Sequence, residues 1–237
     1  RHPGTPRFPW TGKGRRRPHP PHKANAYPPG SIHHGSADDG NRAQAGRRVD
    51  ARPQTVGPMD LVWLKRDLRL RDHAPLARAA ASGPCLCLYV YEPELLADAT
   101  THASHIQFIN DSLAGLATEL HERGGALITR VGNLPEVFDQ LHAERPIARL
   151  WSHEETGLGI TYERDKRVKR WARAKGVKWI ELPNHGVVRP LAERDGWAGR
   201  WRARMGEPIT PAPERLIGVH EIASAGILSP AALEVAG

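Results

Sequence analysis

The chain has 237 residues, with 34 Lys and Arg against 26 Asp and Glu, which gives a net charge of +8 at pH 7. Residues 1–58 hold 11 of the Lys and Arg and 3 of the Asp and Glu, so all the excess positive charge lies there and residues 59–237 are neutral overall. The charge therefore does not indicate a nucleic-acid-binding body. No apolar run approaches the roughly 18 residues of a membrane span, and none follows a basic start as in a secretory signal.

The first 58 residues predict a disordered basic tail, because they hold 10 of the 21 prolines and 8 of the 23 glycines and few apolar side chains. Three origins are open. The first is upstream DNA translated in frame, with Met59 as the true start. The second is a basic arm that contacts phosphates. The third is a targeting peptide, against which the Pro and Gly density argues.

From Asp60 onward, short apolar runs alternate with longer periodic stretches. Residues 61–64 predict a buried strand, residues 74–81 a short helix that ends at Gly83-Pro84, and residues 85–91 a second strand. Residues 102–123 predict the clearest helix, because apolar residues recur every three or four positions. This stripe consists of Ile106, Ile109, Leu113, Leu116 and Leu120.

The two cysteines, Cys85 and Cys87, lie two residues apart on the second predicted strand and therefore share one face. A pair at this spacing without further ligands is weak evidence for a metal, and two small buried apolar side chains are expected instead. Two cysteines also exclude a disulfide framework, which favours a reducing compartment and a cytoplasmic protein.

Residues 126–130 predict the third strand. Asn133 is expected to cap the helix that follows, with Glu136 placed as in a capping box, and this helix ends before Pro146.

The alternation then continues. Residues 147–152 predict the fourth strand, residues 160–175 a helix that ends at Gly176, and residues 177–182 the fifth strand.

Five predicted strands alternate with helices, and each strand is too apolar to have one face in water. This pattern predicts an open parallel sheet covered by helices on both sides. Because the crossovers between parallel strands are right-handed, the expected fold class is α/β, Rossmann-like and doubly wound. We expect this domain to extend over residues 59–205.

The pattern changes after the fifth strand. Residues 194–205 predict a helix with Trp197 and Trp201, which we expect to pack the following chain onto the sheet. Residues 206–237 contain four prolines and no strong period, which predicts an interdomain linker. We expect this linker to be truncated before a further domain.

Ligands of doubly wound folds bind beyond the carboxyl ends of the strands. Charged and polar residues follow four of the predicted strands, at residues 65–73, 91–96, 152–157 and 184–189. No GxGxxG follows a strand and no GxxxxGK[ST] occurs, so the usual dinucleotide fingerprint and the P-loop are absent.

Three stretches together resemble the DNA photolyase/cryptochrome family. Residues 63–69 (WLKRDLR) look like its opening strand and loop. Residues 152–157 (SHEETG) with 161–165 (TYERD) are similar to its crossing from the fourth strand to a helix. Residues 194–201 (RDGWAGRW) with Met205 look like the segment that leaves the α/β domain. The resemblance covers about residues 59–210, with the blocks in the right order.

The resemblance implies that the α/β domain carries, or lies against, an antenna chromophore, which is a folate, a deazaflavin or a flavin. In this family a following all-helical domain binds FAD and receives the DNA lesion. Light-driven electron donation from reduced FAD then splits a pyrimidine dimer, whereas cryptochromes use the flavin for signalling. The helical domain has no counterpart in this sequence, so no catalytic residue is expected in it.

Two positions depart from the family pattern. Leu64 stands where many members have Phe, and Leu158 stands where many have Asn. We expect both to bear on which antenna is held.

Eight residues at the strand ends are candidates for contact with the antenna or with a partner domain. They are Lys65, Arg66, Asp67, Arg69, Glu92, His153, Glu154 and Glu155. The basic loop, residues 65–72, also contains Arg71 and Asp72. The alternative role of its charges is an ion-pair network that stabilises the loop without contacting a ligand. The alternative role of residues 153–155 is charge complementation at a helix N-terminus.

No metal site is expected, because spacing places no further His or carboxylate beside His153. Glu154 and Glu155 are adjacent and should point to opposite faces of the strand end. The basic stretch at residues 166–175 is expected to be a solvated face balanced by Glu163 and Asp165, with phosphate contact as the alternative.

The sequence therefore predicts an N-terminal fragment of a light-driven, FAD-dependent deoxyribodipyrimidine photolyase, a carbon–carbon lyase of DNA repair. The fragment alone is expected to be inactive, to reach damaged DNA only through the missing domain, and to pair with its own helical FAD domain. The alternative is a cryptochrome-type blue-light sensor, or a stand-alone module that binds a chromophore or a partner without catalysis.

Overall fold

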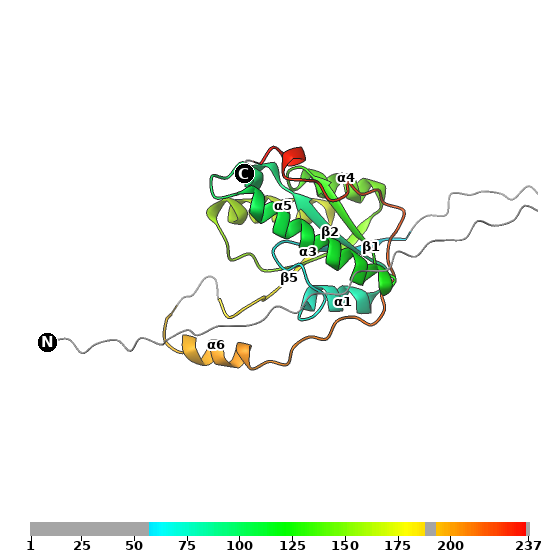
Figure 1. Cartoon of the computed structure of the whole chain (residues 1–237). Helices are drawn as coiled ribbons and strands as arrows, with labels where there is room; N and C mark the ends of the chain where they lie inside the picture. The colour runs from blue at the N-terminus through cyan, green and yellow to red at the C-terminus, as the bar shows by residue number, and fades with distance from the viewer. Residues whose placement is uncertain (1–56, 188–192, 236–237) are drawn as a thin grey trace, which may run out of the picture. The chain divides into compact units, whose positions relative to one another are not determined.

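A computed structural model describes residues 57–187 and 193–235. It contains a five-stranded, wholly parallel sheet in the order β3-β2-β1-β4-β5 (Figure 1). The strands are β1 (Met59–Leu64), β2 (Cys85–Tyr91), β3 (Leu127–Val131), β4 (Ile147–His153) and β5 (Lys178–Leu182). The predicted α/β, doubly wound fold and its five strands are confirmed. The predicted tail lies outside the described residues, except for Gly57 and Pro58.

Helices cover both faces of the sheet (Figure 1). Helices α1 (Ala74–Ser82) and α3 (Ala103–Glu122) pack on one face, and α4 (Glu136–Glu144) and α5 (Gly159–Lys175) pack on the other. The remaining elements are α2 (Pro93–Leu96), α6 (Trp197–Met205) and a 3₁₀ turn (Ala231–Leu233). Since each face has its own apolar layer, the strands must be apolar on both sides.

Alternation along β1 shows this division. Leu61 and Trp63 join the core under α4 and α5, whereas Val62 and Leu64 join the core under α1 and α3. Cys85 and Cys87 are both buried, as predicted, and burial raises the pKa of the Cys85 thiol to about 11. The thiols are therefore apolar packing groups, because the reactive thiolate is disfavoured.

The predicted cap of the fourth helix is wrong. Helix α4 begins at Glu136, Pro135 precedes it, and no side chain caps it. Asn133 contributes only its backbone carbonyl, which accepts a hydrogen bond from the Val137 amide at 3.2 Å. Leu134 is buried in the core, so the chain makes a turn at this point before the helix starts.

The predicted linker is not a free chain. Its described part, residues 206–235, has almost no helix or strand, as its prolines suggest, but it runs along the domain (Figure 1). Leu216, Val219, Ile222 and Leu233 are buried in the two cores. A Cβ on Gly218 would lie 2.5 Å from the carbonyl oxygen of Gly124, so only glycine permits this close approach.

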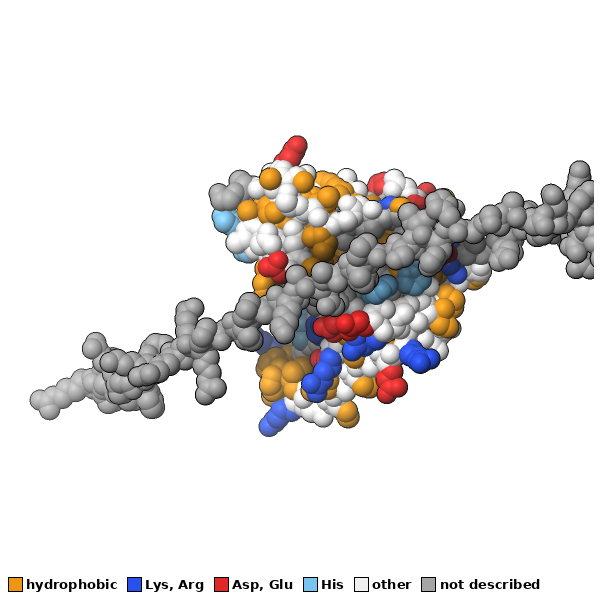
Figure 2. Space-filling model, turned by 45° about the vertical axis from the view of Figure 1, so that its right-hand side comes forward, with side chains coloured by type: hydrophobic (Ala, Val, Ile, Leu, Met, Phe, Trp, Pro, Cys, Tyr) orange, Lys and Arg blue, Asp and Glu red, His pale blue; other side chains and the backbone are white. Residues whose placement is uncertain are grey.

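The expectation that Trp197 and Trp201 pack the chain onto the sheet is also wrong. Helix α6 buries none of its residues, and both tryptophans are 43% exposed. Figure 2 shows basic and apolar side chains side by side at the lower edge of the molecule, where α6 lies in Figure 1. Within residues 57–187 and 193–235, no helix is long and apolar enough to cross a bilayer.

Candidate functional site

Two neighbouring hollows at the carboxyl ends of the strands share the loop of Lys65 and Arg66. The strand order reverses between β1 and β4, which is the topological switch point where doubly wound folds usually bind ligands. One hollow, of about 210 Å³, lies at this point; we call it the switch-point hollow. Its lining consists of Lys65, Arg66, Asp67, His153, Glu154, Glu155, Thr156, Asn184 and His185.

A larger cavity, of about 400 Å³, opens one strand further along, beyond the ends of β1 and β2. We call it the large cavity. Its lining consists of Leu64, Lys65, Arg66, Tyr89, Val90, Tyr91, Glu92, Leu95, Leu96, Asp98, Thr100, Thr101, His105, Ile106, Ile109, Glu155, Leu158, Thr161 and Arg164. This volume lies within the range of small-molecule and cofactor sites.

Apolar and aromatic side chains form much of the large cavity. Leu64 comes from β1, Tyr89 and Tyr91 from β2, and Ile106 and Ile109 from α3. The two tyrosine rings meet edge to face, with their centroids 5.1 Å apart. Such a lining suits a flat, conjugated ring.

Both departures from the family pattern, Leu64 and Leu158, line the large cavity. Leu158 precedes the first residue of α5, provides no side-chain cap, and is 49% exposed. The two leucines therefore contribute to the shape of this cavity.

A network of buried charges forms one side of the large cavity. Arg164 of α5 is 3% exposed and donates from Nη1 to Glu92 at 2.7 Å, from Nη2 to Glu155 at 3.0 Å, and from Nε to Asp165 at 2.9 Å. Its guanidinium also lies 4.6 Å from the ring centre of Trp63. This arginine thus joins β1, β2, the loop after β4, and α5.

Burial changes the titration of the polar groups in this cavity. Desolvation raises the pKa of Glu92, although the positive charge of Arg164 opposes the shift. Desolvation and the neighbouring Tyr91 and Glu92 raise the pKa of Tyr89. The Tyr89 hydroxyl is therefore neutral at physiological pH and available as a hydrogen-bonding group.

In the switch-point hollow the buried polar groups Asp67 and His153 pair with each other. Asp67 is buried and accepts hydrogen bonds from the Lys65 backbone amide at 2.8 Å and from Nδ1 of His153 at 2.5 Å. Burial alone would raise the pKa of Asp67, but the hydrogen bonds from His153 and the Lys65 amide, together with the nearby His73 ring, outweigh it and hold the pKa far below its usual range. Desolvation lowers the pKa of His153.

Asp67, His73 and His153 are the only group of three potential metal ligands found in the described ranges. Nε2 of His73 lies 2.9 Å from Asp67, yet it has no hydrogen bond of acceptable geometry. However, Nδ1 of His73 accepts a hydrogen bond from the Leu76 amide at 3.1 Å, which places the proton of a neutral ring on Nε2. A metal at Nε2 would need the opposite tautomer, so the arrangement fits a polar triad around the Asp67–His153 hydrogen bond better than a metal site.

The eight predicted site residues divide between the hollows. Lys65, Arg66, Glu92 and Glu155 line the large cavity. The switch-point hollow, but not the large cavity, is lined by Asp67, His153 and Glu154. Both are lined by Lys65, Arg66 and Glu155. Arg69 lines neither cavity; it donates to Asn184 at 2.7 Å and to the Asp72 carbonyl, and so joins two loops.

The cations of the basic loop differ in what they can offer to a ligand. Lys65 is occupied, because Nζ donates to Asp165 at 3.0 Å and to the His153 carbonyl at 3.1 Å. Arg66 is exposed and has no ion pair or hydrogen bond to another residue of the described part of the chain. Of the predicted cations, Arg66 is therefore the one best placed to meet an anionic group.

Sequence reasoning missed several residues. Arg164 lies in the TYERD stretch but is not among the predicted site residues, although it organises the large cavity. Tyr89 and Tyr91 were assigned only to a strand, yet their spacing of two already places them on one face. His73 belongs to the polar stretch 65–73, but no local pattern pairs it with His153, which lies far along the chain.

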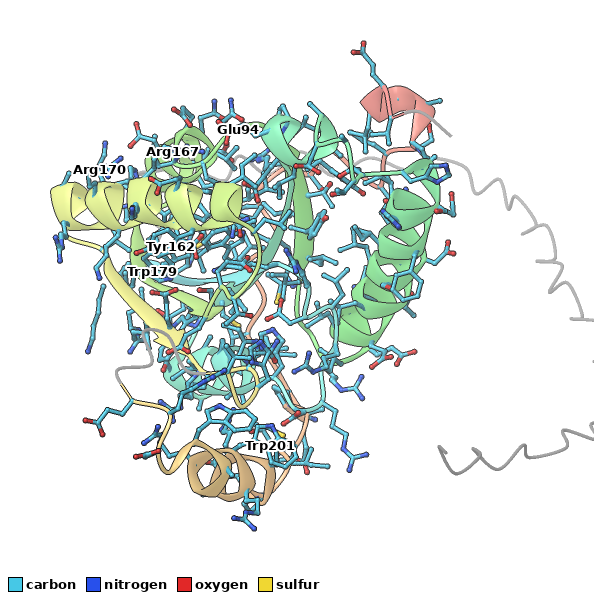
Figure 3. The ribbon with its side chains drawn as sticks, turned by 90° about the vertical axis from the view of Figure 1, so that its left-hand side faces the viewer. Glu94, Tyr162, Arg167, Arg170, Trp179 and Trp201 are labelled. Carbon is cyan, nitrogen blue, oxygen red and sulfur yellow. The ribbon has the colours of Figure 1, made fainter. Side chains whose placement is uncertain are left out.

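The basic stretch of α5 is a solvated face, as expected, and Glu163 pairs with Lys166. Asp165 does not balance this face as predicted, because it pairs with Lys65 and Arg164. Val168, Trp171 and Ala172 are buried, whereas most of the basic side chains are exposed. Figure 3 shows Arg167 and Arg170 on the outer side of this helix, and Arg167 pairs with Glu94 at 2.7 Å.

Comparisons with known proteins agree on one family. The family model described as DNA photolyase matches residues 60–195. A deoxyribodipyrimidine photo-lyase of Halobacterium salinarum is 30% identical over 180 residues, which cover 66% of this chain and 36% of that protein. The chain thus spans little more than a third of this relative's length.

Two solved structures share the fold. A Synechocystis cryptochrome superposes with a TM-score of 0.63 at 22% identity, over 75% of this chain and 40% of that one. An archaeal photolyase from Sulfolobus tokodaii, solved with two FAD molecules and described as implying a novel light-harvesting cofactor, has a TM-score of 0.58 at 17% identity. The match covers 71% of this chain and 40% of the archaeal one.

Proposed function

The chain belongs to the DNA photolyase family, and we propose that its α/β domain holds an antenna chromophore in the large cavity. The observation that carries this proposal is the cavity itself: about 400 Å³, lined by apolar and aromatic side chains and by a few fixed polar groups. The classes that fit are a folate, a deazaflavin or a flavin. The Sulfolobus tokodaii photolyase, with its two FAD molecules, supports a flavin as one of them.

The proposed site residues follow from this assignment. Glu92 and Arg164 would contact the ring, and Arg66 would meet an anionic tail, such as a phosphate, at the mouth. Asp67 and His153 would hold the loops beside the cavity without contacting the chromophore. Arg69 would keep the interface role expected from its place in the family motif.

The function of the whole protein is a further part of the proposal. We propose a light-driven photolyase that repairs pyrimidine dimers in DNA through an FAD-binding helical domain, on which catalysis depends. The family match and the halobacterial photo-lyase support it. A cytoplasmic location belongs to the same proposal, and two free, buried cysteines are consistent with a reducing compartment.

A cryptochrome-type sensor is the second candidate, because a Synechocystis cryptochrome has the same fold with a TM-score of 0.63. The proposed antenna site does not distinguish the two candidates. The two are separated by light-dependent repair of dimer-containing DNA by the protein with its helical domain, which only the photolyase would perform.

Chromophore binding can be tested on the chain directly. The purified chain is mixed in turn with FAD, FMN, 5-deazariboflavin and methenyltetrahydrofolate, separated from free compound by gel filtration, and analysed by absorbance. We expect one class to be retained in a ratio near one per chain. A folded chain that retains none of the four compounds would contradict the antenna function.

A further inference from the structure

Glu92 is a buried acid in a mainly apolar cavity. It lies directly after β2, is 8% exposed, and lines the large cavity. Burying a carboxylate costs free energy unless its oxygens find partners. The hydrogen-bond partners of its two carboxylate oxygens therefore indicate which groups this acid can still bind.

Arg164 satisfies only one side of the Glu92 carboxylate. Oε1 accepts from Nη1 of Arg164 at 2.7 Å, whereas Oε2 accepts no hydrogen bond from any of the described residues. Oε2 is not one of the sealed, unpaired atoms of the structure, so it keeps access to the cavity that Glu92 lines. The cavity thus has a free, strong acceptor in its wall.

The Glu92 carboxylate is also held in a fixed place. All three nitrogens of the Arg164 guanidinium are occupied by acids, namely Glu92, Glu155 and Asp165. Turning Oε2 towards Arg164 would require breaking one of these pairs. A free acceptor on a fixed carboxylate selects a donor with defined geometry.

We propose that Glu92 is the specificity-determining residue of the large cavity, and that Oε2 accepts a hydrogen bond from a ring N–H on the edge of a flat heteroaromatic ligand. The inference rests on the proposed antenna function and adds the chemistry by which the ring is chosen. Leu64, Ile106 and Ile109 offer apolar contact to the ring, so the N–H is the group that orients it. A ring without this donor leaves the buried acceptor unpaired and binds more weakly.

The test compares ring pairs that differ only at the donor. Lumiflavin and N3-methyllumiflavin represent the flavin and deazaflavin rings, and 6-methylpterin and 3,6-dimethylpterin represent the folate ring. Affinities for the full chain are measured by fluorescence titration. In whichever ring class binds, we expect the N–H compound to bind about tenfold more tightly or better than its N-methyl partner.

Substitution then assigns the preference to Glu92. In Glu92→Gln, the amide oxygen can serve Arg164 while the NH₂ group faces the ring N–H, so the preference should fall to about twofold or less. Glu94→Gln is the matched control, because Glu94 is two residues away, pairs with Arg167, and does not line the cavity (Figure 3). It should keep the full preference. Circular dichroism verifies the fold of both variants.

The outcomes separate the inference from the proposed function. Equal binding of an N–H and N-methyl pair by the unsubstituted chain would overturn the role of Glu92 and leave the antenna function standing. Retention of the preference in folded Glu92→Gln would do the same. If the folded chain binds no ring of either class, the antenna function fails and the inference with it. The first comparison needs no variant, so it can overturn the inference even where Glu92→Gln does not fold.

Discussion

The large cavity and the switch-point hollow share the Lys65–Arg66 loop, but their polar groups are used differently. In the switch-point hollow, Asp67 and His153 bond to each other, so these two side chains are already occupied. In the large cavity, Glu92 keeps one oxygen free and the surroundings are mainly apolar. Topology alone would favour the first hollow. The free oxygen of Glu92, the apolar lining and the greater volume favour the second.

The sharpest way to break this comparison is to fill each hollow in turn. Ile109→Trp places an indole in the large cavity and should weaken chromophore binding by about 100-fold, because the ring and the indole compete for one space. Thr156→Trp, which enlarges a side chain of the switch-point hollow, should change the affinity by less than about twofold. The measurement is a fluorescence titration with the chromophore that the chain retains. The reverse order of effects would assign the ligand to the switch-point hollow.

The second prediction concerns stability, to which we expect the switch-point hollow to contribute more than the large cavity. Asp67→Asn should lower the free energy of unfolding by about 2–4 kcal/mol, because a buried, charged acceptor of several hydrogen bonds is lost. Urea unfolding followed by circular dichroism measures this loss. Asp72→Asn is the control, since its carboxylate is more than half exposed, and it should stay within about 0.5 kcal/mol. If Asp67→Asn also lost no more than about 0.5 kcal/mol, the triad would have no structural role.

The third prediction is a pH dependence located in the switch-point hollow. The pKa of His153 is lowered in the folded chain. Below pH 6.5, the ordinary pKa of histidine, the unfolded chain therefore binds more protons at this residue than the folded chain does. Stability should therefore fall as the pH drops from 7 to 5. The lowered pKa of Asp67 acts in the same sense at lower pH, below its ordinary 3.8. Urea midpoints at pH 7, 6 and 5 should decline less in His153→Asn than in the unsubstituted chain. Parallel curves would place the pH dependence elsewhere.

The smallest expected effect concerns Arg66, which lines both hollows. Arg66→Ala should weaken FMN binding by about two- to fivefold and leave riboflavin binding nearly unchanged, because an exposed cation contributes little to a screened phosphate contact. The difference between the two ligands should shrink further as salt is added. Arg71→Ala, a neighbouring arginine that lines neither hollow, should leave both affinities as they are. An equal loss for FMN and riboflavin would assign Arg66 to the ring and not to the phosphate.

The sequence alone determined the sheet, its helices and the edge that carries the site, because hydrophobic periodicity is a local property of the chain. It also placed Lys65, Arg66, Glu92 and Glu155 at the strand ends, where they line the large cavity. The cap at Asn133 failed because burial of Leu134 outweighed a local capping pattern.

The pairings inside the site were decided by the tertiary structure. Glu92 meets Arg164 across 72 residues of chain, and Asp67 meets His153 across 86. Such contacts depend on strand order and crossover geometry, which no local pattern records. The same holds for residues 206–235, whose apolar side chains have no period but fill spaces along the domain. Local periodicity specifies which elements form, whereas the choice between a closed triad and an open cavity depends on which distant side chains the fold brings together.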